Sequence, residues 1–241
     1  MRNYKEEFEK RVAFIKNLLA ESGAKGVIFG NSGGKDCALV GILCKAACDN
    51  TVGVIMPCSS RRNYDRDARD ARAVAEQYGI ETRIVDLTPV KEAALKQLEN
   101  VVEMIPTSEI NIAPRLRMTT LYAIAACESL LVAGTGNRSE IYVGYFTKWG
   151  DGGHDFNPIS DLTVTEVYEF LRYLDAPSSI IDKAPSAGLY ESQTDESDMG
   201  FKYSELDAYL ATGEAEPEIK ERIERMHRRS QHKREDIKRF K

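Results

Sequence analysis

The amino-acid sequence predicts an α/β fold, a doubly wound parallel sheet with helices on both faces. Short apolar runs indicate buried strands, and segments with helical spacing separate them. Three of the runs end in unusual sequences: GNSGGKDC, MPCSSRR and AGTGNRSE. Right-handed crossovers would bring these three ends to one edge of the sheet, where such folds bind ligands. The expected strands are 25–30, 52–57, 82–87 and 130–135.

Helical spacing of apolar residues predicts the elements between the strands. An amphipathic helix is expected at 4–21, where Phe8, Val12 and Ile15 share one stripe. Further helices are expected near 35–48, 65–79, 90–103 and 113–129.

The last part of the chain has a different pattern. Residues 147–158, TKWGDGGHDFNP, predict a loop rich in glycine and aspartate. Thr163 and Glu166 have the spacing of a capping box, which predicts a helix start. The polar stretch 185–200 is rich in turn-forming residues. We find no internal repeat or linker, so residues 1–241 are expected to form one domain.

Composition narrows the class of protein. Of the residues, 42% are hydrophobic and 29% charged, as is ordinary for a soluble protein. The 33 basic and 38 acidic residues give a net charge of −5, which argues against a nucleic-acid partner. A charged N-terminus and the lack of a long apolar run argue against secretion and membrane insertion. Five cysteines without framework spacing suit a reducing compartment, so we expect a cytoplasmic protein.

The most informative segment is GNSGGKDC, which follows the first strand and opens a helix. Backbone N–H groups and the positive end of the helix would face an anion there. A Gly-Gly turn alone is as often a purely structural turn as a phosphate-binding one. The segment also lacks the Gx₄GK[ST] pattern of the other common phosphate-binding loop. The full string SGGKD, however, resembles the pyrophosphate-binding loop of the ATP pyrophosphatase (PP-loop) superfamily, SGGxD followed by Ser or Thr. That resemblance assigns to ATP the residues Gly30, Asn31, Ser32, Gly33, Gly34, Lys35, Asp36 and Cys37.

Further sequence blocks resemble the NAD synthetase family, in the order in which that family has them. The resemblance runs from about residue 25 to 233, and FTKWGDGGHD is its most discriminating block. It implies a Rossmann-like, adenine nucleotide alpha hydrolase-like fold and a homodimer, for which the helix at 113–129 is a candidate surface. The blocks are NIAPRLRM at 111–118, AGTGNRSE at 133–140, YFTKWGDGGHD at 145–155, PISDLT at 158–163, SQTDES at 192–197 and HK at 232–233.

The activity that the resemblance implies has two steps. ATP adenylates the nicotinate carboxylate of deamido-NAD, and ammonia then displaces AMP to give NAD. The sequence contains no segment expected to form a glutaminase domain, so free or separately delivered ammonia is the expected nitrogen source. Two alternatives remain open. One is another PP-loop adenylating amidotransferase or thiolase, and the other is a catalytically inactive ATP-binding module.

The resemblance also implies roles for individual residues. Asp36 and Glu140 would hold Mg²⁺, which prefers oxygen ligands, although each could merely cap a helix. Thr135 and Ser186 would contact ATP. Asp36, Lys148 and Asp155 would be the catalytic residues. Contacts to deamido-NAD would come from Arg115, Lys148, Asp155, His232 and Lys233.

Two positions depart from the family pattern. Cys37 stands where the superfamily has Ser or Thr, and a thiol is a poorer hydrogen-bond partner. A helix N-terminus could lower its pKa and make it reactive, or it could simply fit the loop. Val164 stands where the family commonly has lysine. Either Arg138 or Lys183 substitutes for that cation, or ATP is held with one charge fewer.

Overall fold

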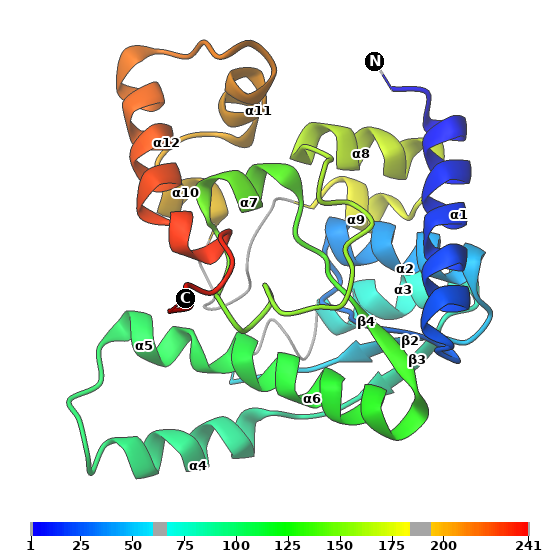
Figure 1. Cartoon of the computed structure of the whole chain (residues 1–241), viewed down its shortest axis with the longest axis horizontal. Coiled ribbons are helices and arrows are strands. Elements are labelled where there is room, and N and C mark those ends of the chain that lie inside the picture. The colour runs from blue at the N-terminus through cyan, green and yellow to red at the C-terminus, as the bar shows by residue number, and fades with distance from the viewer. Residues whose placement is uncertain (1, 60–66, 184–193, 241) are drawn as a thin grey trace.

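The computed structural model describes residues 2–59, 67–183 and 194–240 (Figure 1). Ser186 lies outside the described residues, so its proposed contact with ATP stays a prediction. The strands form one parallel sheet in the order β3-β2-β1-β4. The predicted fold class is therefore confirmed. The strands are β1 (Gly26–Gly30), β2 (Thr51–Ile55), β3 (Glu81–Ile84) and β4 (Leu130–Ala133).

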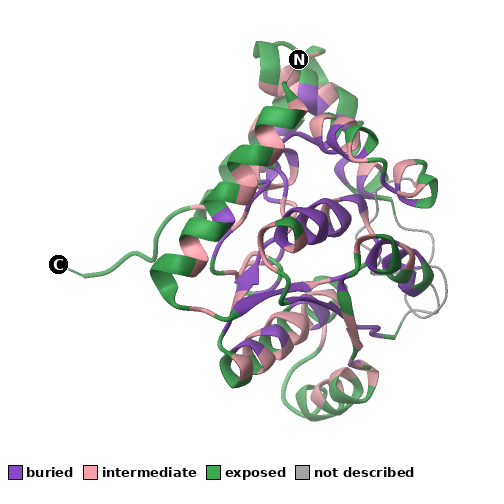
Figure 2. Ribbon diagram, turned by 90° about the vertical axis from the view of Figure 1, so that its right-hand side faces the viewer, coloured by how far each residue is buried: buried purple, intermediate pink, exposed green. Residues whose placement is uncertain are grey.

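Helices cover both faces of the sheet, as alternate side chains of β1 demonstrate. Val27 and Phe29 pack into one apolar cluster, and Ile28 packs into another on the opposite face. Burial on both faces explains why the central strands are continuous apolar runs rather than alternating ones. Figures 1 and 2 show the sheet between these helix layers. The first face is covered by α1 (Tyr4–Ser22), α2 (Lys35–Ala47), α3 (Ala68–Tyr78) and α8 (Val164–Tyr173), and the second by α6 (Ile112–Glu128), against which α4 (Thr88–Leu98) packs.

The order of the strands creates a switch point between β1 and β4. From β1 the chain crosses through α2 to β2 on one side, whereas β4 arrives on the other side of β1. Loops that follow β1 and β4 therefore leave the carboxyl edge in different directions and open a crevice. Because the three unusual sequences follow β1, β2 and β4, their described residues meet at this edge, as the sequence predicts; residues 60–62 of MPCSSRR lie outside the described residues.

A second group of helices lies beyond the carboxyl edge of the sheet (Figure 1). Its apolar cluster centres on Met199, Leu206 and Ile223. Helix α8 joins the two parts, since Val167 packs in the sheet core and Val164 packs in this second cluster. The remaining elements are α5 (Pro106–Ile110), α7 (Arg138–Val143), α9 (Ser178–Ile181), α10 (Asp195–Met199), α11 (Tyr203–Thr212), α12 (Pro217–Arg229) and a 3₁₀ turn at Gln231–Lys233.

A local sequence signal located the start of α8. The capping box of α8 is present: Glu166 N donates to Thr163 Oγ1 at 3.3 Å, and Thr163 N donates to Glu166 Oε2 at 2.9 Å. The expected helix at 90–103 is shorter in the structure, because α4 ends at Leu98 and turns lead to α5. Among the described residues, no helix is both long enough and apolar enough to cross a membrane.

Candidate active site

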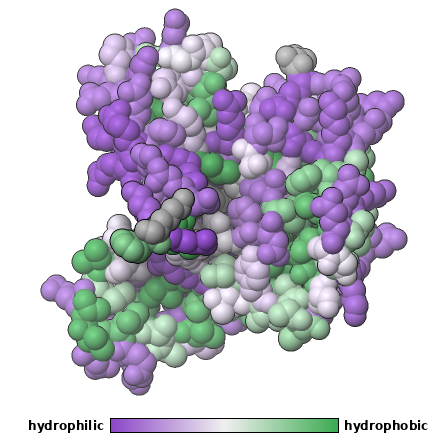
Figure 3. All heavy atoms as spheres, in the orientation of Figure 1, coloured by the Kyte–Doolittle hydropathy of each residue, from purple (hydrophilic) through white to green (hydrophobic). Residues whose placement is uncertain are grey.

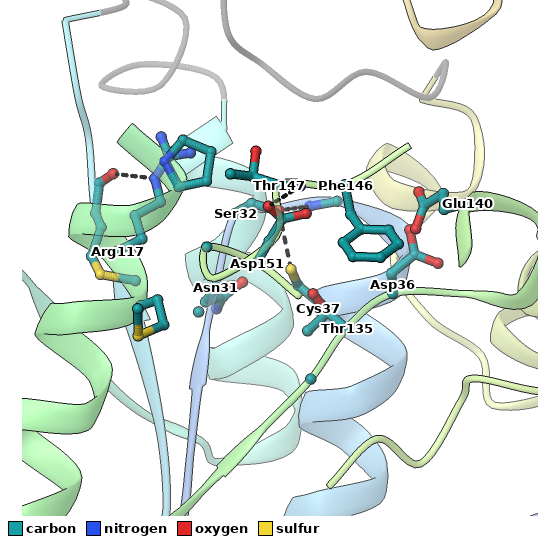
Figure 4. A pocket seen from close by; sticks show the side chains of 18 of the residues that line it. Asn31, Ser32, Asp36, Cys37, Arg117, Thr135, Glu140, Phe146, Thr147 and Asp151 are labelled. Atoms are coloured by element: carbon teal, nitrogen blue, oxygen red, sulfur yellow. Dashed lines mark hydrogen bonds between the residues drawn. The ribbon is translucent and has the colours of Figure 1, made fainter. Parts of the chain in front are cut away.

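A cavity of about 560 Å³ opens at the carboxyl edge of the sheet. Its walls come from the loops after β1, β2 and β4, the N-terminal part of α6, and residues 144–153. Figure 4 shows side chains from these separate segments pointing into one space. The cavity therefore joins most of the sequence blocks that the family resemblance singled out.

The loop after β1 is locked against α3. Gly33 has φ of +70°, and a Cβ at this position would overlap the carbonyl oxygen of Asp67. Asn31 Nδ2 donates to the carbonyl oxygen of Ala71 at 3.2 Å, while Asn31 Oδ1 accepts from Gly33 N at 3.3 Å. Glycine is required here both for its positive φ and for the close approach of α3. The loop thus presents its backbone to the cavity in a fixed shape.

Asp36 and Glu140 face each other in the cavity, although they lie in the first turns of two different helices, α2 and α7 (Figure 4). Asn137 holds both, because its Nδ2 donates to Asp36 Oδ1 at 3.1 Å and its backbone N donates to Glu140 Oε2 at 3.2 Å. Glu140 also completes the capping box of α7, so capping and facing the cavity are compatible roles. Lys35 Nζ lies 2.7 Å from Asp36 Oδ2 and 3.9 Å from Glu140 Oε1.

Asp36, Glu140 and Lys35 lie close enough for the charge of each to affect the others. Burial, followed by the neighbouring carboxylate of Asp36, raises the pKa of Glu140 well above its usual value. Burial lowers the pKa of Lys35, but the charges of Asp36 and Glu140 outweigh burial and the net shift is upward. Two largely buried carboxylates, with side chains 14% and 17% exposed, share one ammonium, so a further cation would be stabilised between them.

The donor set at Asp36 and Glu140 fits Mg²⁺. This ion takes hard oxygen ligands and usually keeps waters and substrate phosphates beside one or two carboxylates. Within the described ranges, we find no cluster of three or more His, Cys, Asp or Glu side chains suited to a metal. Two carboxylates beside a loop shaped for phosphate match a metal that arrives with a nucleotide.

Cys37 is buried beside the phosphate loop. Its Sγ lies 3.1 Å from Ser32 Oγ, and the two form a hydrogen bond. Burial raises the pKa of the Cys37 thiol. Burial therefore works against a lowered pKa at Cys37, and the reactivity of this thiol stays a prediction. Thr135 lines the same wall of the cavity, as its predicted contact with ATP requires (Figure 4).

The family commonly has lysine at position 164, and Arg138 and Lys183 are the candidate substitutes for its charge. The structure distinguishes between these two residues. Arg138 is exposed and donates to the carbonyl oxygen of Leu210, outside the cavity. Lys183 lines the cavity, where its Nζ lies 3.0 Å from Gly33 O. It also contacts two carboxylates, Asp67 at 2.8 Å and Asp70 at 2.7 Å.

Four of the residues predicted to hold deamido-NAD form a connected strip. Lys233 lines the cavity and donates to the carbonyl oxygens of Gly144 and Phe146. Lys148 Nζ donates to the carbonyl oxygen of His232, and Arg115 Nη2 donates to that of Lys148 at 3.4 Å. Burial lowers the pKa of Lys233. These contacts bring the C-terminal His-Lys pair to the loop of the FTKWGDGGHD block, although the two are distant in sequence.

Asp155 lies apart from that strip. Its carboxylate accepts hydrogen bonds from Tyr122 Oη at 2.9 Å and from Val132 N at 2.8 Å. The side chain is exposed and does not line the cavity. The cavity of a single chain therefore offers no explanation for the predicted contact between Asp155 and the substrate.

Arg117 is a cavity residue that sequence reasoning missed. Its Nε donates to the carbonyl oxygen of Met56 at 3.2 Å, and burial lowers the pKa of its guanidinium. Helix phase gives the signal that could have found it. Arg117 is four residues from the buried Ala113 and Leu121, whereas Arg115 is on the exposed side of α6.

Asp151 is a second missed residue, within the FTKWGDGGHD block (Figure 4). Its Oδ1 accepts a hydrogen bond from Thr147 N at 3.0 Å, which fixes the loop. Burial raises the pKa of Asp151. The sequence alone did not separate this aspartate from Asp155, four residues later.

Comparison with known proteins agrees with this geometry. The family model described as NAD synthase matches residues 7–237. An NH(3)-dependent NAD(+) synthetase from Carboxydothermus hydrogenoformans is 48% identical over 96% of this chain and 95% of the relative. One from Archaeoglobus fulgidus is 41% identical over 97% of this chain and 95% of the relative.

Solved structures give the same result. The chain superposes on an NMN synthetase from Francisella tularensis with a TM-score of 0.93 and 37% identity, over 99% of each chain. An NH3-dependent NAD synthetase from Campylobacter jejuni, in complex with the nitrate ion, gives a TM-score of 0.81 and 28% identity over the full length of both. On the family match, the relatives and these structures together, the chain belongs to the NAD synthase family.

Proposed function

We propose that this protein is an ATP-dependent ligase that converts the nicotinate carboxylate of deamido-NAD into its amide with ammonia. The observation that carries the proposal is the pairing of Asp36 and Glu140 beside the SGGKD loop, in one cavity. Full-length relatives named as NH(3)-dependent NAD(+) synthetases support the choice of reaction. They do not favour the other adenylating enzymes considered from the sequence.

In the first step, a carboxylate oxygen of the substrate attacks the α-phosphorus of ATP. A phosphorus–oxygen bond forms, the bond between the α-phosphorus and the bridging oxygen breaks, and pyrophosphate leaves. The backbone of Ser32, Gly33 and Gly34 and the N-terminus of α2 would bind the phosphates. Mg²⁺ bound to Asp36 and Glu140 would neutralise phosphate charge. Thr135 and Ser186 are proposed as further ATP contacts.

In the second step, ammonia attacks the activated carbonyl carbon. AMP leaves with the electron pair of the broken carbon–oxygen bond, and the nitrogen loses one proton to give the amide. This route requires no covalent bond to the enzyme, so catalysis rests on positioning and electrostatics. Arg115, Lys148, His232 and Lys233 are proposed to hold the substrate along the strip that they form.

We also propose a homodimer, formed through the face that α4 and α6 share. Helix α4 has no buried residue, and large apolar side chains on and after it are exposed. Figure 3 shows hydrophobic side chains gathered over this end of the molecule. Asp155 and its partner Tyr122, on α6, lie on the exposed side of the chain, where a second copy could use them. The exposed apolar residues are Val90, Leu98, Val101, Val102 and Ile105.

The same comparisons raise a second candidate substrate, nicotinate mononucleotide. The observation in its favour is the TM-score of 0.93 to a protein named NMN synthetase, against 0.81 to one named NAD synthetase. Both candidates present the same nicotinate carboxylate, and they differ in the adenylyl half of the dinucleotide.

The free thiols of all five cysteines support a reducing, cytoplasmic location.

One assay tests the proposed reaction and decides between the two candidate substrates. The purified chain is incubated with ATP, Mg²⁺ and ammonium, with deamido-NAD in one series and nicotinate mononucleotide in the other. We expect amide and pyrophosphate in equal amounts with deamido-NAD; without ammonium we expect no amide and no multiple-turnover release of pyrophosphate. A higher kcat/KM with the mononucleotide would replace the first candidate by the second. ATP binding without pyrophosphate release in either series would establish an inactive nucleotide-binding module instead.

A further inference from the structure

Lys35 occupies an unusual position for a lysine. It is the first residue of α2, and only 6% of its surface is exposed. The positive end of a helix disfavours a cation, and burial disfavours any charge without a partner. The SGGxD pattern leaves this position open, so the loop itself does not require lysine. Its partners in the cavity must therefore account for its placement.

The ammonium of Lys35 lies where its neighbours concentrate negative charge. It is 2.7 Å from Asp36 Oδ2 and 3.9 Å from Glu140 Oε1. The ring of Tyr168 and the ring of Tyr203 flank it, with centroids at 6.0 and 5.6 Å. An Mg²⁺ ion held by both carboxylates would sit about 2.0–2.1 Å from one oxygen of each. The ammonium already approaches this space.

The charges around Lys35 also favour a cation at this position. Asp36 and Glu140 repel each other, and Asp195 adds a third nearby carboxylate, which Tyr203 Oη contacts at 3.1 Å. Within the described residues, Lys35 is the cation that contacts both Asp36 and Glu140. A cation between the carboxylates stabilises the folded chain before any metal arrives. A divalent cation would compete for the same oxygens.

We propose that Lys35 is an internal placeholder for the divalent cation. In the nucleotide-free chain its ammonium holds Asp36 and Glu140 together, and a metal that binds both must displace it. The flexible stem of lysine allows this movement without a change in the helix. Mg²⁺ without nucleotide therefore binds weakly, so the site fills when metal and phosphates enter together. This inference rests on the metal site of the proposed function.

Thermal unfolding at increasing Mg²⁺ concentration, without nucleotide, tests the placeholder. Wild type is compared with Lys35→Met, which keeps the volume of the side chain and removes its charge. Lys45→Met is the matched control, because Lys45 lies on α2 in an exposed ion pair with Asp49. We expect Lys35→Met to unfold at a lower temperature without metal. We also expect it to bind Mg²⁺ about tenfold more tightly or better, since a unit charge near the site is gone.

Equal Mg²⁺ affinity of Lys35→Met and wild type would overturn the placeholder. The double variant Lys35→Met/Glu140→Gln should lose the added Mg²⁺ response, and retention of that response would also contradict the proposal. If Lys35→Met does not fold, Lys35→Arg provides the comparison. The bulkier guanidinium, whose charge is fixed, should weaken Mg²⁺ binding relative to wild type. An unchanged Mg²⁺ affinity would contradict the proposal.

Adding ATP separates this inference from the proposed metal site. Suppose that Mg²⁺ raises the unfolding temperature of wild type in the presence of ATP, but that wild type and the Lys35 variants show the same Mg²⁺ affinity without ATP. The placeholder proposal is then wrong, while the metal site stands. If no protein responds to Mg²⁺ under either condition, the metal site is wrong as well. The ligase assay stands independently of both results.

Discussion

The ammonium of Lys183 lies 3.0 Å from the carbonyl oxygen of Gly33, across 150 positions of sequence. The same ammonium contacts Asp67 and Asp70, which stand at and just inside the start of α3. All three side chains are at most 10% exposed. The phosphate loop, the start of α3 and the residues after α9 are therefore joined by one cation.

Replacing Lys183 by Met should destabilise the protein and weaken ATP binding. Two nearly buried carboxylates would lose their shared cation, and removing one partner of a buried pair costs about 3–5 kcal/mol. Thermal unfolding and calorimetric titration with ATP measure the two effects. Lys10→Met, which removes an exposed pair with Glu6, should change unfolding by at most about 1 kcal/mol.

Asp70→Asn distinguishes two roles for Lys183. If the ammonium positions the loop, this variant loosens the network and weakens ATP binding by severalfold. If the ammonium instead moves to bind a phosphate, loss of a competing carboxylate leaves ATP affinity unchanged or increases it. The second result would identify Lys183 as the cation that substitutes for the lysine absent at position 164.

Gly33→Ala should impair the phosphate loop more than an equal change elsewhere. Its Cβ would meet the carbonyl oxygen of Asp67, so the loop must shift away from α3. We expect a loss of about 1–3 kcal/mol in unfolding free energy and a large loss of ATP affinity. Gly23→Ala is the matched control, because Gly23 has the same φ of +70° and no heavy atom within 4 Å of its added Cβ. Equal effects of the two variants on ATP binding would contradict the packing argument.

Alkylation tests the state of the thiols. Cys127 is exposed, whereas Cys37 is buried, and burial raises the pKa of its thiol. Since the thiolate is the nucleophile, iodoacetamide near neutral pH should label Cys127 at least about tenfold faster than Cys37. Peptide mass spectrometry over time gives both rates. Rapid labelling of Cys37 in the folded protein would show that it is activated after all.

The sequence predicts the sheet and its functional edge because both depend on local signals. Apolar runs such as GVIFG and TVGVI are buried on two faces, and the loop after GVIFG carries a pair of glycines. Asp36 and Glu140 follow different strands, so their meeting follows from parallel topology. The metal and ATP roles at this edge come from the family resemblance and stay predictions, whereas the meeting of the two carboxylates follows from the topology.

Other parts of the site depend on packing that the sequence does not encode locally. The orientation of Arg117 into the cavity follows from the rotation of α6 against the sheet. The placement of Asp155 beside Tyr122, and the approach of Lys183 to Gly33, each join segments distant in sequence. Charge balance around Lys35 likewise needs the positions of residues from three segments. These contacts are tertiary, and motif spacing alone could not supply them.

Glu140→Gln should make the metal-free protein more stable while it abolishes adenylation. The pKa of Glu140 is raised in the folded chain, first by burial and then by Asp36, so ionisation of this carboxyl opposes folding. Its stabilising contribution is complete below the unfolded pKa of about 4.3 and is lost as pH rises through the folded pKa. At neutral pH the neutral amide avoids that loss, and we expect a melting temperature about 2–4 °C higher, or about 1 kcal/mol. The difference from wild type should shrink as pH falls toward 4.3, where both side chains are neutral. Lower stability than wild type at neutral pH would contradict the argument that ionisation of Glu140 opposes folding, and full adenylation would remove Glu140 from the proposed metal site.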